Sequence, residues 1–127
     1  MVSDADMIRH ECCHALGALM AGATSVKIVL RERYAETIPH WPNGFCSDEQ
    51  FLTALIAGRA HVVEGMSTIL DEDQIKCADP ELVERIEAKV LPEISDRISC
   101  LTDSEVQHML DTIREDGALL ITPVVLH

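Results

Sequence analysis

The residues His10, Glu11, Cys12, Cys13 and His14 form the pattern H-E-x-x-H, whose residue types and spacing could hold and use a metal ion. In a helix, residues four apart share one face, so the imidazoles of His10 and His14 can reach the same ion. Glu11 is rotated by about 100° from His10, which places its carboxylate beside the open coordination position. There it can take a proton from metal-bound water and pass it to a leaving amine. The pattern predicts a catalytic zinc site in which two histidines and a carboxylate leave a fourth position for water.

A helix over residues 4–21 is expected to position these side chains. The segment is rich in helix formers and contains no proline, Ser3 or Asp4 could cap it, and Asp6 adds favourable charge to the first turn. Gly22 supplies a stop signal. Apolar residues recur at helical spacing, at Met7, Cys12, Ala15, Leu16, Leu19 and Met20. The alternative is a surface helix that carries two unrelated histidines.

The remaining elements are expected to complete an α+β fold, predominantly α-helical, in a single domain over residues 1–127. They are a strand at 25–31, an irregular loop at 31–44, a helix from 47 or 48 to about 65 that starts with a capping box, a short helix at 71–77, a helix from 79 to about 94 that Pro92 could kink, a helix from 102 to near 117, and a tail at 118–126 that forms a strand or a packed extension.

Composition excludes several classes of partner. The chain has 22 acidic and 10 basic side chains and a net charge of −12, without a basic cluster, which argues against binding to nucleic acid or to anionic membrane surfaces. No stretch approaches the roughly 20 apolar residues that a membrane span requires, and the N-terminus lacks the layout of a signal peptide. The five cysteines show no C-x-x-C spacing. We therefore expect free thiols in a reducing compartment, with the cytoplasm as the localisation.

Three segments together resemble the peptidase M41 family, the zinc protease domain of FtsH-type proteases. The first is R-H-E-C-C-H-A-L at 9–16 with Gly22 and the strand V-K-I-V-L at 26–30; the second is L-I-A-G-R-A at 55–60; the third is the acidic L-D-E-D-Q-I at 70–75. Their order and approximate spacing agree with the family over residues 8 to 90. The resemblance implies a zincin-like metalloprotease domain with a short β-strand beside the H-E-x-x-H helix, and hydrolysis of peptide bonds.

The resemblance also implies a third zinc ligand, an aspartate at the start of a helix, in addition to His10 and His14. Asp71 is the first choice because it precedes an apolar residue at the family's spacing, and Asp73 is the alternative. Other acidic residues are weaker candidates, namely Asp79, which competes as a helix cap, and Glu64, which other zincins would suggest. In a peptidase, Glu11 is the expected catalytic residue whichever acidic residue completes the site.

The chain departs from the family in ways that bear on function. It has no G-x-x-x-x-G-K phosphate loop and so no ATPase module to unfold substrates, which predicts small or unfolded polypeptides as substrates and a possible partner ATPase. Cys12 and Cys13 replace small residues of the motif; they are small buried fillers, or they crowd the helix packing or expose a thiol beside zinc. The segment 61–63 replaces paired acidic residues, and its His61 is the one other histidine that merits a test.

On the substrate side, a strand at 26–30 at the edge of a sheet could pair with an extended peptide beside the metal. The loop around Trp41 and Phe45 could form a wall of the cleft, or a surface loop pinned by one buried aromatic side chain. Two alternatives to a peptidase stay open. One is a catalytically inactive zinc-binding regulatory or interaction module, and the other is a helical interaction domain without a metal.

Overall fold

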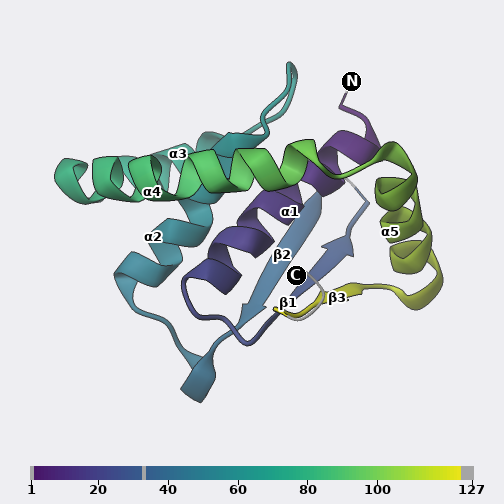
Figure 1. Cartoon of the computed structure of the whole chain (residues 1–127), viewed down its shortest axis with the longest axis horizontal. Helices are drawn as coiled ribbons and strands as arrows, with labels where there is room; N and C mark the ends of the chain where they lie inside the picture. Colours follow the sequence, from purple (N-terminus) through teal and green to yellow (C-terminus); the bar gives the residue numbers. More distant parts are fainter. Residues whose placement is uncertain (1, 33, 124–127) are drawn as a thin grey trace.

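The computed structural model describes residues 2–32 and 34–123, and these form an α+β fold that is mostly helical, as predicted (Figure 1). In chain order the elements are α1 (Asp4–Met20), β1 (Ser25–Leu30), β2 (Ala35–His40), the 3-10 turn η1 (Pro42–Gly44), α2 (Asp48–Ala57), the 3-10 turn η2 (Gly58–Ala60), α3 (Ile69–Lys76), α4 (Pro80–Ser99), α5 (Asp103–Asp116) and β3 (Leu119–Ile121). None of these helices combines the length and the apolar character that a membrane crossing requires.

The sheet has three antiparallel strands in the order β2-β1-β3. Val26 of β1 lies opposite Pro39 on one side and Ile121 on the other, while Ile28 lies opposite Thr37. The strand at 26–30 is therefore central, and the expectation that it forms the edge beside the metal is wrong. Within the sheet that the described residues form, β2 and β3 are the two outer strands.

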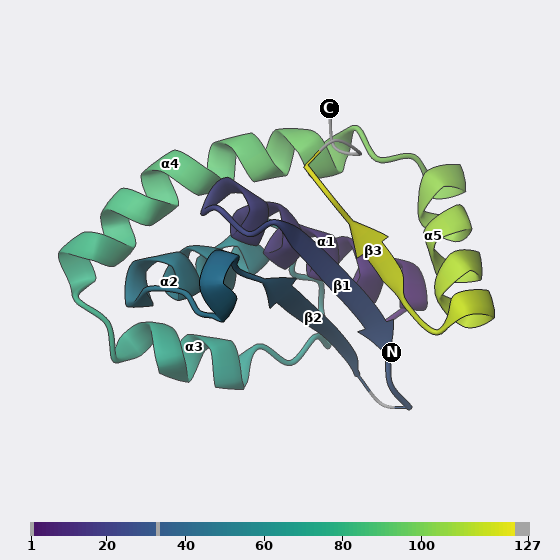
Figure 2. The same ribbon diagram turned by 90° about the horizontal axis from the view of Figure 1, so that it is seen from below.

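Helix α1 lies at the centre of the fold, between the sheet and the long helix α4 (Figures 1 and 2). Ile8, Cys13 and Ala15 of α1 are completely buried. At Gly17 the helix approaches α2 so closely that an added Cβ would overlap the side chain of Ala57. The motif helix is therefore held along its length by the core rather than lying on the surface.

The local signals for helix starts are confirmed. Ser3 accepts a hydrogen bond from the backbone N–H of Asp6. Ser47 begins α2 and Thr102 begins α5, each with the reciprocal pair of bonds of a capping box. Capping depends on residues three apart in sequence, so a single sequence is enough to identify it.

Three predicted boundaries are wrong. Residues 35–40, expected in a loop, form β2, whose pairing with β1 outweighs the turn signal of Pro39. Helix α2 ends at Ala57 rather than near residue 65, and the chain turns at Gly58. Helix α4 continues to Ser99 past Pro92, whose side chain is exposed and so disturbs no core packing.

All five cysteines are free. Cys12 and Cys13 are buried, and burial raises the pKa of each thiol to about 12. They therefore act as small apolar fillers of the core around α1, one of the alternatives that the sequence left open, and not as reactive thiols.

Candidate metal centre

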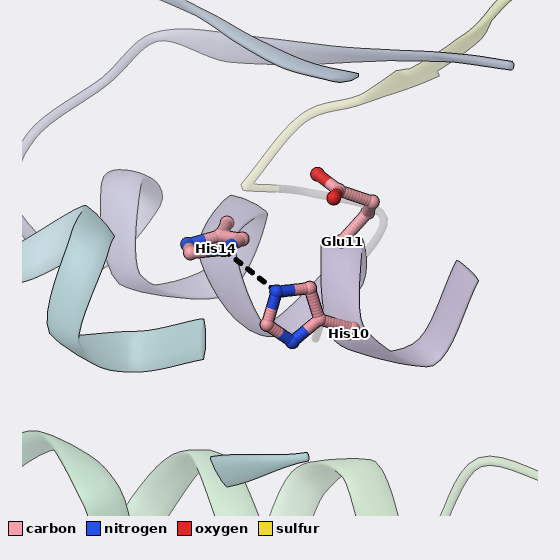
Figure 3. Close-up of side chains that lie close together, drawn as sticks. All are labelled: His10, Glu11 and His14. Carbon is pink, nitrogen blue, oxygen red and sulfur yellow. Dashed lines mark hydrogen bonds between the residues drawn. The ribbon is translucent and has the colours of Figure 1, made fainter. Parts of the chain in front are cut away.

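The imidazoles of His10 and His14 meet on one face of α1, one helical turn apart. Both side chains are buried, and their rings pack edge to face with centroids 4.6 Å apart. The Nε2 atoms are 3.1 Å apart (Figure 3). The spacing that the motif predicts is therefore realised, with both histidines pointing at a common position.

Backbone carbonyls fix the orientation of both rings. His10 Nδ1 lies 2.8 Å from the carbonyl oxygen of His61, and His14 Nδ1 lies 2.7 Å from that of Ala54. A carbonyl oxygen only accepts, so each Nδ1 carries its hydrogen and each neutral ring keeps a lone pair on Nε2. Two lone pairs facing each other at 3.1 Å repel unless a cation, either a proton or a metal ion, lies between them.

Asp71, in the first turn of α3, contacts His14. Its Oδ2 lies 3.3 Å from His14 Nε2, and the hydrogen bond with His14 lowers the pKa of this carboxyl group. Asp73 is exposed and lies about 200° around the helix from Asp71, so it points elsewhere. Glu64 and Asp79 are also exposed. The structure therefore brings the first-choice aspartate to the histidines, and none of the other candidates.

The spacing of these atoms fits a tetrahedral ion. Zinc with bonds of about 2.0–2.1 Å to nitrogen and oxygen would place its ligand atoms about 3.3 Å apart. The Nε2–Nε2 distance is 3.1 Å and the distance from His14 Nε2 to Asp71 Oδ2 is 3.3 Å. The ligand atoms of His10, Glu11 and His14 also lie within 4.8 Å of one another. The cluster of His10, Glu11 and His14 could therefore bind a metal ion. Imidazole and carboxylate groups are ligands that several divalent metals accept.

Glu11 takes a different direction from the histidines, toward the strands (Figure 3). The hydroxyl group of Thr37, on β2, donates to its carboxylate in a short hydrogen bond and also reaches its carbonyl oxygen at 3.2 Å. Burial raises the pKa of Glu11, and the bond from Thr37 opposes this shift in part. Glu11 is thus a carboxylate with raised proton affinity, held next to the histidines by the outer strand.

The two histidines differ in their proton affinity. Burial and the neighbouring His14 lower the pKa of His10. Burial is the largest single influence on His14 and disfavours its protonation, but the hydrogen bonds with Asp71 and with the carbonyl of Ala54, together with the charges of Glu11 and Asp71, outweigh it, and the pKa of His14 is raised. In the metal-free site His14 is therefore the histidine that holds a proton more readily.

Two clefts meet at the candidate site. One of about 390 Å³ lies between the start of α1 and α3, and one of about 350 Å³ lies between β2 and α2; both are lined by Glu11, Ala35 and Asp71. The second cleft has apolar walls that include Trp41 and Phe51. Trp41 is buried and Phe45 is exposed, so the predicted role of this loop in a cleft wall holds for Trp41 alone.

Sequence reasoning missed two features of this site. The sequence predicts an irregular loop at Thr37, and the only strand signal there is weak, namely the β-branched pair Thr37 and Ile38 close to Tyr34. The carbonyl oxygens of Ala54 and His61 carry no side-chain signature, so no pattern in the sequence could identify them. His61, the remaining histidine of interest, contributes its carbonyl to the site and directs its ring to Asp6, 3.0 Å away.

Comparisons with known proteins add no relative. No protein-family model matches the chain, and searches of curated proteins and of solved structures find no similar protein. The interpretation of the site therefore depends on its geometry.

Proposed function

We propose that this chain is a zinc metallopeptidase with an M41-type, zincin-like site, in which His10, His14 and Asp71 hold the metal and Glu11 is the catalytic base. One observation carries the proposal: the Nε2 atoms of two histidines face each other at 3.1 Å, a carboxylate oxygen of Asp71 lies 3.3 Å from one of them, and both Nδ1 atoms are already bonded to carbonyl groups. Ligand histidines typically use their second nitrogen in this way.

The residues of the site suit hydrolysis of an amide. When bound, zinc would supply Lewis acidity, polarising the scissile carbonyl and lowering the pKa of water. Glu11 would take a proton from the attacking water as its oxygen adds to the carbonyl carbon, and would give that proton to the amine as the C–N bond breaks. Its raised pKa suits a group that accepts a proton and later returns it.

The surroundings suit an extended polypeptide as substrate. Strand β2 is the outer strand next to Glu11, and a peptide could add to its free side by backbone hydrogen bonds. The apolar wall formed by Trp41 and Phe51 could receive a side chain next to the scissile bond. A peptide that pairs with a strand must be extended, which favours small or unfolded polypeptides as substrates and leaves unfolding to a partner ATPase. The free cysteines suit a reducing compartment such as the cytoplasm.

The proposal is tested by metal content together with a single substitution. Untagged protein purified without chelator should contain about one zinc per chain by elemental mass spectrometry, and His10→Ala should lose it. Glu11→Gln should keep the zinc and lose peptidase activity on an unfolded polypeptide such as casein by about 100-fold or more.

Each result distinguishes between functions. Zinc that His10→Ala removes, without detectable hydrolysis by the wild type, would replace the peptidase with the inactive zinc-binding module. A folded protein that takes up no zinc on titration would overturn the metal site itself. Hydrolysis that survives Glu11→Gln would show that another group is the base.

A further inference from the structure

One turn of the chain contacts both candidate histidines and the helix that carries Asp71. Gly58 packs against the ring of His14 so closely that an added Cβ would overlap it. The carbonyl of His61 accepts the hydrogen bond from His10 Nδ1. Between them, Arg59 reaches α3, the helix that carries Asp71. The segment 58–61 is therefore a common support for residues that come from two separate helices.

We infer that Arg59 is a positioning residue, which holds Asp71 against the histidines through its ion pair with Glu72. The inference rests on the metal site proposed above. It assigns to Arg59 a role in metal affinity, not in contact with the metal or the substrate.

Helix α3 has little else to fix its position. Of its eight residues Ile75 alone is buried, and Ile69 and Leu70 are 67% and 78% exposed. Its N-cap residue, Thr68, makes no side-chain capping bond. A short helix attached at one point in its last turn is free to pivot at the other end. Asp71 lies at that other end, in the first turn.

Arg59 provides the missing attachment of α3 through a bidentate contact with Glu72. Its Nε lies 2.9 Å from Glu72 Oε1 and its Nη2 lies 2.5 Å from Glu72 Oε2, the fork geometry that guanidinium and carboxylate groups favour. Its Nη1 lies 2.8 Å from Oε1 of Glu87 on α4. All three side chains are about two-thirds buried, so solvent screens this network less than it screens a surface ion pair.

Because Glu72 and Asp71 are neighbours in one helix, the contact of Glu72 with Arg59 also fixes where Asp71 lies. Adjacent residues project about 100° apart, so a fixed Glu72 also fixes the direction of Asp71, which faces His14. Arg59 follows directly after Gly58, whose backbone lies on the ring of the same histidine. Arg59 therefore fixes Asp71 relative to His14 itself, not to a distant part of the fold.

The test compares the zinc affinity of three variants, measured by competition with a chromophoric chelator. Glu72→Ala removes the partner on α3, and Glu87→Ala is the matched control, since it removes the same charge from the same arginine on α4. We expect Kd for zinc to rise about 10–100-fold in Glu72→Ala, the range found for groups that support metal ligands, and less than threefold in Glu87→Ala.

Arg59→Ala separates positioning from electrostatics by the sign of its effect. Loss of a nearby positive charge should tighten binding of a divalent cation, whereas loss of positioning should weaken it. We expect Kd to rise at least tenfold. In the metal-free protein, hydrogen exchange in α3 should become faster in Glu72→Ala and stay at the wild-type rate in Glu87→Ala.

The outcomes separate this inference from the proposed function. If the wild type binds zinc and Arg59→Ala or Glu72→Ala binds it as tightly, the positioning role is wrong and the metal site stands. Equal losses in Glu72→Ala and Glu87→Ala would also overturn it, by showing a general effect of stability or charge. If the wild type binds no zinc, the metal site and this inference fail together.

Discussion

The two helices that supply the candidate ligands are attached to the protein in different ways. Helix α1 is buried along most of its length, with nine buried residues between Ile8 and Ala18, and each of its two histidines is oriented by a backbone carbonyl. Helix α3 buries Ile75 alone and is joined to the turn at 58–61 by the ion pair between Arg59 and Glu72. The proposed metal site thus combines a rigid half, on α1, with a loosely attached half, on α3.

This difference assigns distinct work to the two halves. The facing imidazoles are preorganised. The free energy required to hold their lone pairs close together comes from packing of the core around α1. The aspartate lies on an element that local opening can release, which places it at the low-stability end of the molecule. A bound ion would therefore stabilise α3 far more than α1.

Removal of the metal is the largest test of this contrast. With free zinc at about a thousand times Kd, binding stabilises the folded state by about 4 kcal/mol, all of which chelation removes. Denaturant unfolding with and without chelator measures that loss. After chelation, amides of α3 should exchange through local opening, whereas amides of α1 should still exchange only through global unfolding, and therefore more slowly. Equal exchange rates in the two helices would show that the two halves are not independent.

Gly58→Ala tests the rigid half of the proposed site, which α1 supplies. The backbone of Gly58 is helical, with φ of −61°, so alanine adds no strain there, but its methyl group would overlap the His14 ring. We expect zinc affinity to fall about 100-fold, measured by chelator competition. The matched control is Gly17→Ala, whose methyl group would press on Ala57 instead. That variant should lose about 1–3 kcal/mol of stability and keep its zinc affinity.

The part of the site that the sequence predicted is the part that local rules determine. The capped helix and the spacing of His10 and His14 follow from residues within one or two turns. Strand β2 depends on pairing with β1 across a turn. Pro39 is typical of a loop, so the sequence alone favoured a loop at this position. The end of α2 could not be predicted either, because Gly58 is required by a ring 44 residues away in sequence, not by its neighbours.

The third ligand lies between these cases. Asp71 was selected by resemblance to a family, and its contact with His14 depends on Arg59 and Glu72. Arg59 appeared in the sequence only as part of a block, without a partner. Ion pairs between separate elements leave no periodic signal, which is why the positioning network was visible only in the structure.

The pairing of His14 with Asp71 in the metal-free protein can be tested by varying the pH. The raised pKa of His14 means that its pairing stabilises the metal-free protein fully below pH 6.5 and is lost as pH rises through that raised value. The lowered pKa of Asp71 means that its contribution is present above pH 3.8 and is lost as pH falls through the lowered value. The metal-free site is therefore best paired in the interval between these limits.

If zinc binds the two Nε2 atoms, it displaces any proton that His14 holds. Calorimetry at pH 6.5 in buffers of different ionisation enthalpy should then show net release of protons when zinc binds. In Asp71→Asn the group that raises the pKa of His14 is lost, so fewer protons should be released and zinc should bind more weakly. Unchanged proton release in that variant would show that Asp71 does not govern the protonation of His14.

Asp6→Asn is the smallest test, because it disturbs the rigid half where the contacts are redundant. Asp6 Oδ1 lies 3.0 Å from Nε2 of His61, the residue whose carbonyl orients His10. Both side chains are partly exposed, so the pair contributes about 0.5 kcal/mol or less to stability. Zinc affinity should stay within about twofold, because a second contact holds the backbone of His61. Its N–H donates to the carbonyl of Gly58, and Gly58 packs against His14 of α1. A tenfold loss of affinity would show that α1, like α3, depends on one ion pair, and the contrast between the halves would disappear.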